Sequence, residues 1–568
     1  MFHRSENSSH KFVYSIRRPG EKQKEGRNPK HSVHDSCHNR GMFSRLLTRA
    51  LKSYQDHLVE FWALMILMCV AAALRLTRLP EHITWNGDTA RDLIVARHLW
   101  EYHDPLALGH SAYGLRIESE NRGEDPYGMS HYPTYFFRLM AIVWGVSGSV
   151  FHVALLQVLY QLLGMVILYV GIRQLFGKSA AWLTLLLIAL SSFSIDHSLS
   201  GAIHLTLPLF YTVFTCLVLS QKYKKTWLMV FSALLCVLGS LLHYAFLLCF
   251  VWVIGIGIFS FWRAKHYRAA TLFGSVVTLA GIMLFFTLHL EVIQFYGIWP
   301  FVGTFTGQYQ QSVPLGLAQY QVFDLVLNRL STMFTTWPEA VAALTVGLVG
   351  LVFSSRKDLR AALTGFIGFA LSLVILVATK SASTFHIEQV LFFDYTLLIL
   401  LGSSCGIIFE LPRKANKVAM CFIIGLTLAS STQFGYRFPV RHYTLPIAAA
   451  EAHAKELLVK NPYLVEDTAF YVTSYYSWDY ETPTVVFWLE ELSGKKLMSL
   501  VDTYNNLNWE GTPKQHIIVS CQRFPGLPAM EQRSCQTFLQ HFTENGTYFQ
   551  EKELFSNEHY RSFLYKKR

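Results

Sequence analysis

Long apolar stretches recur along the chain between residues 58 and 434, and short polar segments separate them. A helix needs about 20 mostly apolar residues to cross a bilayer. The pattern therefore predicts an α-helical polytopic membrane protein with about eleven spans. We place them near 58–76, 150–171, 179–195, 205–220, 227–243, 245–262, 270–290, 339–354, 361–379, 390–409 and 418–434.

Lysine and arginine alternate between the loops in a way that predicts the orientation. Basic residues gather in the segments 172–178, 222–225, 263–268, 356–360 and 413–417, whereas 196–204 and 243–245 have none. Cytoplasmic loops carry such an excess of positive charge. We therefore expect a cytoplasmic N-terminus and a C-terminal region on the outer side. The loop bias explains most of the net charge of +11, so we predict no nucleic-acid partner.

Composition agrees with this layout, because 52% of the 568 residues are apolar and only 15% are charged. An average soluble protein has about 25% charged residues. Residues 1–45 are polar and basic without an apolar signal-peptide core, and they predict a disordered cytoplasmic tail. Residues 46–434 form the predicted membrane domain, in which the outer loop 77–149 carries interfacial helices.

Residues 435–568 predict an extracytoplasmic C-terminal domain of the α/β class. Strand-like runs occur at 469–473, 517–521, 548–555 and 562–565, and 484–492 suits either a helix or a strand. Cys521 and Cys535 both lie here, and the outer side is oxidising, so a disulfide between them is one possibility that the sequence leaves open.

The segment that follows the first span contains the first candidate for chemistry. From Thr89 to Trp100 the apolar spacing predicts an amphipathic helix on the membrane surface, with Asp88 at its N-cap. An N-cap aspartate has a sufficient structural reason, because it satisfies free backbone N–H groups. The local pattern alone therefore does not make Asp88 catalytic.

Four segments in this order resemble the C-type (GT-C) glycosyltransferase superfamily. More narrowly, they resemble the protein O-mannosyltransferase and lipid A aminoarabinose transferase group, which is family 39-like in bacteria. The resemblance covers roughly 55–435. The matching segments are Gly87–Asp92 with Ala96-Arg97, Ser130–Phe137, Leu242–Ala245 and Lys380–Tyr395.

The resemblance implies a GT-C-like fold and an inverting transfer of a sugar from a polyprenyl-phosphate donor. The acceptor would be an extracytoplasmic glycolipid, polysaccharide or protein. The enzyme itself would lie in the plasma or inner membrane. It implies Asp88 as the general base, since a partly desolvated carboxylate is a stronger base. The phosphate leaving group needs cationic or donor groups. The substrate-binding candidates are Arg91, Arg97, Tyr132, His243, Tyr244, Lys380 and His386.

Structural explanations remain open for several of these residues. Arg91 and Arg97 suit solvated or lipid-headgroup positions, His243 suits an interfacial tip, and Lys380 suits a snorkelling span end. We predict no cofactor. A divalent metal is not assigned, because the acidic residues Glu118, Glu120, Glu124 and Asp125 have no diagnostic spacing.

Two departures from the family pattern keep other functions open. Neither 196–204 nor 385–388 has the arginine that many relatives carry there. The alternatives are a transporter or flippase for a lipid-linked or anionic solute, and a non-catalytic membrane scaffold. Transport predicts charges deep in the spans, and these spans are nearly free of charge at mid-depth.

Overall fold

The computed structural model describes part of the chain, in segments separated by gaps. These are residues 58–77, 83, 85, 87–101, 103, 134–191, 194–195, 198, 206–240, 242, 246–288, 290, 387–410, 413–414, 416–425, 447–460, 468–473, 482–495, 515–523 and 548–568. The predicted tail 1–45 and the predicted spans 339–354 and 361–379 lie outside them. The chain divides into two compact units, Met1–Met65 and Ile66–Arg568, and most described residues belong to the second.

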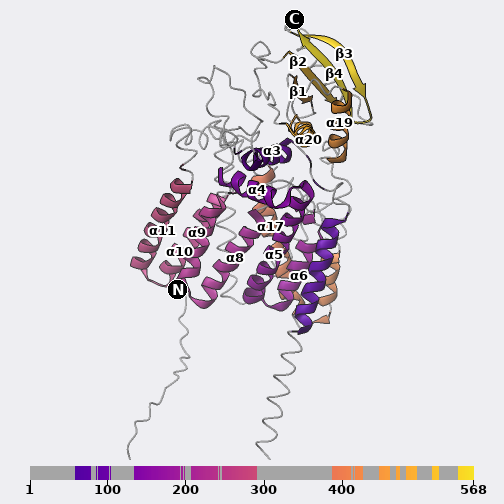
Figure 1. The fold of residues 1–568 in the computed structure, drawn as a ribbon. Helices are drawn as coiled ribbons and strands as arrows, with labels where there is room; N and C mark the ends of the chain where they lie inside the picture. Colours follow the sequence, from indigo (N-terminus) through magenta and orange to yellow (C-terminus); the bar gives the residue numbers. More distant parts are fainter. Residues whose placement is uncertain are drawn as a thin grey trace, which may run out of the picture. The chain divides into compact units, whose positions relative to one another are not determined.

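The described apolar stretches are helical, as the pattern predicts (Figure 1). Three described helices are long and apolar enough to cross a membrane: Leu58–Leu76, α5 (Val150–Phe176) and α11 (Tyr267–Leu288). The other predicted spans with described residues coincide with α6 (Lys178–Leu190), α8 (Thr206–Tyr223), α9 (Thr226–Gly239), α10 (Phe246–Arg263), α17 (Ile387–Phe409) and a short helix, Asn416–Gly425. The total of eleven spans stays a prediction.

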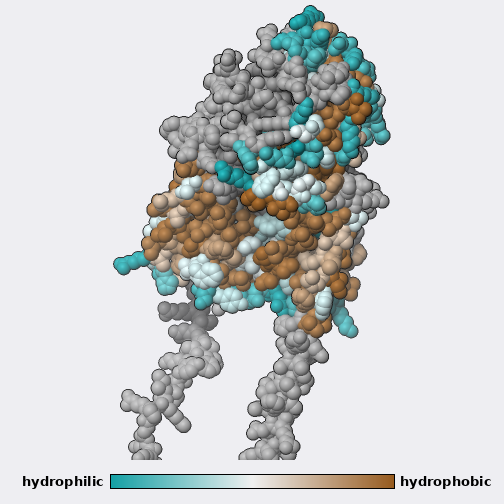
Figure 2. All heavy atoms as spheres, viewed as in Figure 1, coloured by the Kyte–Doolittle hydropathy of each residue, from teal (hydrophilic) through white to brown (hydrophobic). Residues whose placement is uncertain are grey.

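Brown, hydrophobic side chains cover much of the visible face of α8–α11 (Figure 2). Many large apolar side chains there are exposed, including Trp227 on α9, Val251 on α10 and Leu272 on α11. Such continuous apolar surface is expensive in water and suits contact with lipid. The exposed faces therefore agree with an integral membrane protein.

Small residues let α17 lie against α6 at close range. A Cβ added at Gly402 would collide with Thr184, and one added at Gly406 would collide with the backbone of Ala180. The hydroxyls of Thr184 and Ser403 also lie within hydrogen-bond distance, at 3.4 Å. Helices in a membrane associate through such close packing, because lipid removes the hydrophobic force between them.

A buried arginine joins the first predicted span to the end of α6. Arg75 is fully buried and donates to the carbonyl oxygens of Ala189 (2.8 Å) and Ile188 (3.3 Å) and to Ser194 Oγ (3.2 Å). The last carbonyls of a helix lack partners within the helix and carry its negative dipole end. Arg75 supplies both the donors and the charge that this end of α6 needs.

The C-terminal part of the chain forms a four-stranded mixed sheet with the order β1-β2-β4-β3. Its strands are β1 (Thr468–Thr473), β2 (His516–Gln522), β3 (Tyr548–Ser556) and β4 (Tyr560–Lys567), which confirms the four predicted strand runs. β1 and β2 are parallel, and β4 is antiparallel to β2 and β3. The ambiguous run 484–492 is helical, in α20 (Thr482–Ser493).

α19 (Ile447–Lys460) is a helix that the sequence analysis missed. Its signals were present: alanine-rich composition and two glutamate–lysine pairs spaced i,i+4, Glu451–Lys455 and Glu456–Lys460, which form ion pairs. On the neighbouring sheet Cys521 is disulfide-bonded. Its predicted partner, Cys535, lies outside the described residues.

One hydrophobic core spans sequence regions that we expected in different domains. α3 (Gly87–Glu101) and α4 (Thr134–Ser147) come from the predicted outer loop, and α19, α20 and the sheet come from the C-terminal region. Buried side chains of all of them belong to a single cluster, with Trp85, Leu93, Trp144, Leu457 and Phe487 among its members. The C-terminal helices and sheet therefore share this core with α3 and α4, and the domain boundary at 434/435 stays a prediction.

Candidate functional site

The site is built around α3, the helix that carries the predicted base. The helix begins at Gly87, so Asp88 is its second residue and lies inside the first turn, not at the N-cap where we expected it. Only the backbone of Asp88 is described. Asp92, one turn later, is buried. Asp88 therefore lies at the start of the helix, whereas Asp92 lies in its second turn.

α3 is buried on more than one face, unlike a helix lying on a membrane surface. Leu93, Ile94 and Ala96 are buried, as the amphipathic pattern predicts. Arg97 and His98, whose side chains contact α20 on one face of α3, are buried as well. α20 covers this face, so the polar side chains of α3 must find their partners inside the protein.

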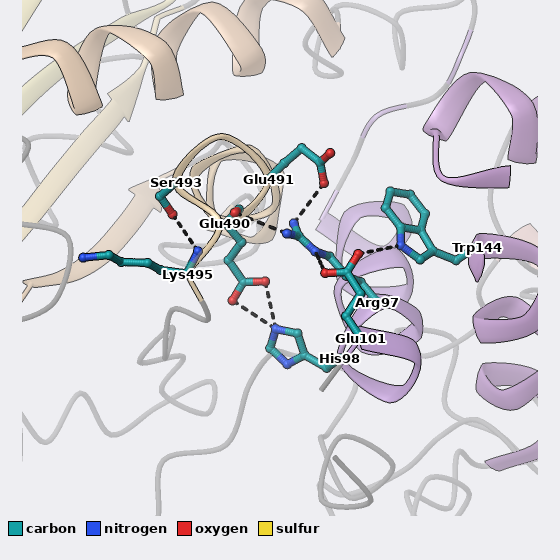
Figure 3. Close-up of polar contacts among 8 residues, drawn as sticks. All are labelled: Arg97, His98, Glu101, Trp144, Glu490, Glu491, Ser493 and Lys495. Carbon is teal, nitrogen blue, oxygen red and sulfur yellow. Dashed lines mark hydrogen bonds and ion pairs between the residues drawn. The ribbon is translucent and has the colours of Figure 1, made fainter. Parts of the chain in front are cut away.

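Arg97 contacts three glutamates, one on its own helix and two on α20, and so joins α3 to α20 (Figure 3). Its Nε donates to Glu101 Oε2 on the same helix at 2.8 Å, and a terminal nitrogen lies 3.0 Å from Glu491 Oε2 on α20. The other terminal nitrogen donates to the backbone carbonyl of Glu490 at 3.3 Å. Burial alone would lower the pKa of Arg97, but the hydrogen bond to Glu101 and the charges of Glu101, Glu491 and Glu490 outweigh it and raise the pKa.

His98 makes the second polar contact between the two helices. Its Nε2 lies 2.8 Å and 3.0 Å from the two carboxylate oxygens of Glu490, and both side chains are fully buried. A buried carboxylate needs hydrogen-bond donors or a cation. His98 and Glu490 therefore satisfy each other where neither could remain alone.

Aromatic side chains surround this polar contact. Trp85 is fully buried, donates from Nε1 to the carbonyl of Thr484 at 3.3 Å, and packs edge-on against Phe487. Trp144 of α4 packs edge-on against the same ring and donates from Nε1 to Glu101 Oε1 at 3.2 Å. Edge-to-face pairs add about 0.5–1.5 kcal/mol beyond area burial. The segment just before α3 and the last turns of the helix are thus both held.

The structure describes only two of the predicted substrate-binding residues, Arg91 and Arg97. Arg91 shares α3 with Asp88, although only its backbone is described. Tyr132, His243, Tyr244, Lys380 and His386 lie outside the described residues, and their roles stay predictions. The contacts described for Arg97 are all with glutamates, which gives it a structural function that the sequence analysis did not assign.

The sequence analysis missed Glu490, Glu491, His98 and Trp85. One signal could have found the glutamates: two adjacent carboxylates end the apolar run Val485–Leu489, where burial requires a cationic or donor partner. The partner itself, on a helix almost 400 residues earlier, leaves no sign in the local pattern. Among the described residues, no cluster of histidine, cysteine and carboxylate side chains has the makings of a metal site.

Comparison with known proteins shows similarity in fold but not in sequence. No family profile matches the chain, and no curated protein matches it. The crystal structure of ArnT from Cupriavidus metallidurans in the apo state is similar with a TM-score of 0.54 and 13% identity, over 89% of this chain and 98% of ArnT. The apo oligosaccharyltransferase of Archaeoglobus fulgidus gives a TM-score of 0.47 and 12% identity, over 81% of this chain and 69% of that one.

ArnT is a lipid A aminoarabinose transferase of the GT-C class. The resemblance that we predicted from the four sequence segments is therefore confirmed for the fold. At 13% identity the likeness concerns the fold alone. It covers nearly the whole of ArnT.

Proposed function

We propose that this protein is an inverting glycosyltransferase of the cell envelope that uses a polyprenyl-phosphate sugar. The observation that carries the proposal is the ArnT-like fold over 89% of the chain. Its weight is increased by the position of Asp88, at the start of the helix that follows the first predicted span. The acceptor is an extracytoplasmic glycolipid, polysaccharide or protein.

In the proposed reaction an acceptor hydroxyl attacks the anomeric carbon of the donor. A new carbon–oxygen bond forms as the bond between that carbon and the phosphate oxygen breaks. Asp88 takes the hydroxyl proton, and the polyprenyl phosphate leaves with the bonding electron pair. General-base catalysis of this kind contributes about 10²- to 10⁴-fold.

The departing phosphate gains negative charge and needs positioned donors. We assign this task to Arg91, Tyr132, His243, Tyr244, Lys380 and His386. All four segments that supply them lie in or shortly before a helix: Arg91 is in α3, Tyr132 precedes α4, His243 and Tyr244 precede α10, and Lys380 and His386 precede α17. Arg97 serves a different purpose, because its described nitrogen contacts are with carboxylates and a carbonyl.

The proposed setting is the plasma or inner membrane. The N-terminus would be cytoplasmic, and the C-terminal region, with α19, α20 and the sheet, would be extracytoplasmic. Lipid is then the solvent of the helices and the source of the donor. The basic loop residues support this orientation, including Lys224 and Lys225 between α8 and α9.

The test is donor cleavage in proteoliposomes. Wild type, Asp88→Asn and Glu553→Gln each receive a panel of polyprenyl-phosphate sugars with a membrane extract as acceptor, and mass spectrometry follows loss of the sugar. Glu553 is an exposed carboxylate on β3 paired with Arg561, so its variant controls for the loss of a charge. Asp88→Asn should lower turnover of one donor by at least about 100-fold, and Glu553→Gln should leave it unchanged. Equal turnover by folded Asp88→Asn and wild type would refute Asp88 as the base.

A further inference from the structure

We propose that α20 of the C-terminal region is the positioning element of the active site, acting on α3 through Arg97 and the Glu490–Glu491 pair. This inference rests on the proposed function, because it concerns the helix that carries the base. It assigns a role to residues that touch neither the donor nor the acceptor. Its basis is a set of direct contacts between two helices almost 400 residues apart.

The contacts attach α3 to α20 at both of its ends. Trp85, just before α3, is tied to the first turn of α20 through the Thr484 carbonyl. Arg97 and His98, nine and ten residues after Asp88, are tied to the last turn of α20. Two attachments at opposite ends set the direction of a helix axis, and the planar fork of an arginine with several partners also restricts rotation about it.

Burial makes this attachment hard to replace. The side chain of Arg97 is 5% exposed, and those of His98 and Glu490 are 0% exposed. Buried polar groups in such surroundings hold one geometry, because any other leaves a donor or an acceptor without a partner. Glu491 and Glu101 are about one-third exposed and link this interior to the surface.

Helix geometry relates this attachment to the base. Asp88 lies nine residues before Arg97, which is about 13–14 Å along a helix axis. A small change in tilt at the Arg97 end therefore displaces the Asp88 end. A misplacement of about 1 Å at the reacting group can cost about 100-fold in rate. The structure thus predicts an effect on turnover from residues far from the chemistry.

The test compares Arg97→Met with Arg97→Lys, and uses Arg561→Met as the matched control. Arg561 also pairs with a glutamate at 2.8 Å, but it does so on the surface of β4 and away from α3. Turnover of the donor is measured at a temperature where all variants are folded. Hydrogen exchange of the peptide 87–101 is measured on the same full-length protein in proteoliposomes.

Arg97→Met should lower kcat by about 10- to 100-fold while the donor KM changes by less than about twofold, because positioning affects the transition state and spares donor binding. Exchange of the α3 amides should become about tenfold faster. Arg97→Lys, which keeps the charge but loses the fork, should recover part of both effects. Arg561→Met should change neither.

Two results would overturn the proposal. One is unchanged kcat and unchanged α3 exchange in Arg97→Met. The other is an equal loss of kcat in Arg97→Met and Arg561→Met, which would indicate general destabilisation. If wild type shows no Asp88-dependent turnover, the proposed function fails, and the exchange of α3 alone then decides whether α20 positions this helix.

Discussion

The buried histidine of α19 makes a prediction about acid that can be worked through in numbers. His453 is fully buried, and its Nε2 lies 2.9 Å from Ser520 Oγ of β2, which is in turn 2.9 Å from Ser562 Oγ of β4. Its ring stacks on Tyr560 at 4.0 Å between centroids. Burial lowers the pKa of His453 from 6.5 to about 3. The protonated ring would gain little stabilisation from its surroundings, because Nδ1 has no hydrogen-bond partner in the described part of the chain.

The direction of the pH effect on the free energy of unfolding follows from the difference in the pKa of His453 between the folded and the unfolded chain. The unfolded chain binds the proton near pH 6.5 and the folded one only near pH 3, so the stabilisation is complete above pH 6.5 and is lost as the pH falls towards 3. Between pH 7.5 and pH 4.5 this difference amounts to about 3 kcal/mol. The whole of it acts on the packing of α19 against the sheet.

Hydrogen exchange of peptides from β2 and β4, corrected for the intrinsic rate, measures the opening free energy at both pH values. In wild type it should fall by about 3 kcal/mol, and in His453→Gln, which does not titrate here, by less than about 1 kcal/mol. Exposed carboxylates such as Glu553 titrate in both proteins, so the comparison subtracts them. An equal fall in the two proteins would refute the reasoning, and so would no fall in wild type.

Three further substitutions test the packing. Gly406→Leu forces α17 away from Ala180, and should cost more than about 3 kcal/mol, measured as a lower Tm and loss of monodisperse protein. Trp85→Ala empties a fully buried site and should cost about 3–5 kcal/mol, measured by thermal unfolding in detergent. Cys521→Ser breaks a disulfide and should cost about 2–5 kcal/mol. Alkylation after denaturation should then label one cysteine more than in wild type, and an unchanged label would contradict the bond.

Local pattern was sufficient for most of the described secondary structure. Apolar runs gave α5, α8, α10 and α11 within a few residues, because a membrane helix must satisfy its backbone internally and show lipid an apolar surface. Short strand-like runs gave the four strands. The sequence failed at α19, where the apolar signal is weak and propensity with charge pairs determines the helix.

Motif order was sufficient for the fold class, and the ArnT likeness confirms it at that level. Neither the motif order nor the likeness to ArnT indicates which polar residues of α3 are buried. Amphipathicity assigns a polar side chain to water whenever no partner is known. Arg97 was therefore expected in contact with water, lipid or substrate, and His98 was not singled out.

The sequence by itself determined the apolar helices, the strands and the place of Asp88 near the start of a helix, since each depends on neighbours along the chain. Only the tertiary structure decided that α20 covers α3, that Arg97 and His98 meet Glu490 and Glu491, and that one core joins the first outer loop to the C-terminal region. The physical reason is separation. A buried charge requires a partner, but the requirement does not say from where in the chain the partner comes.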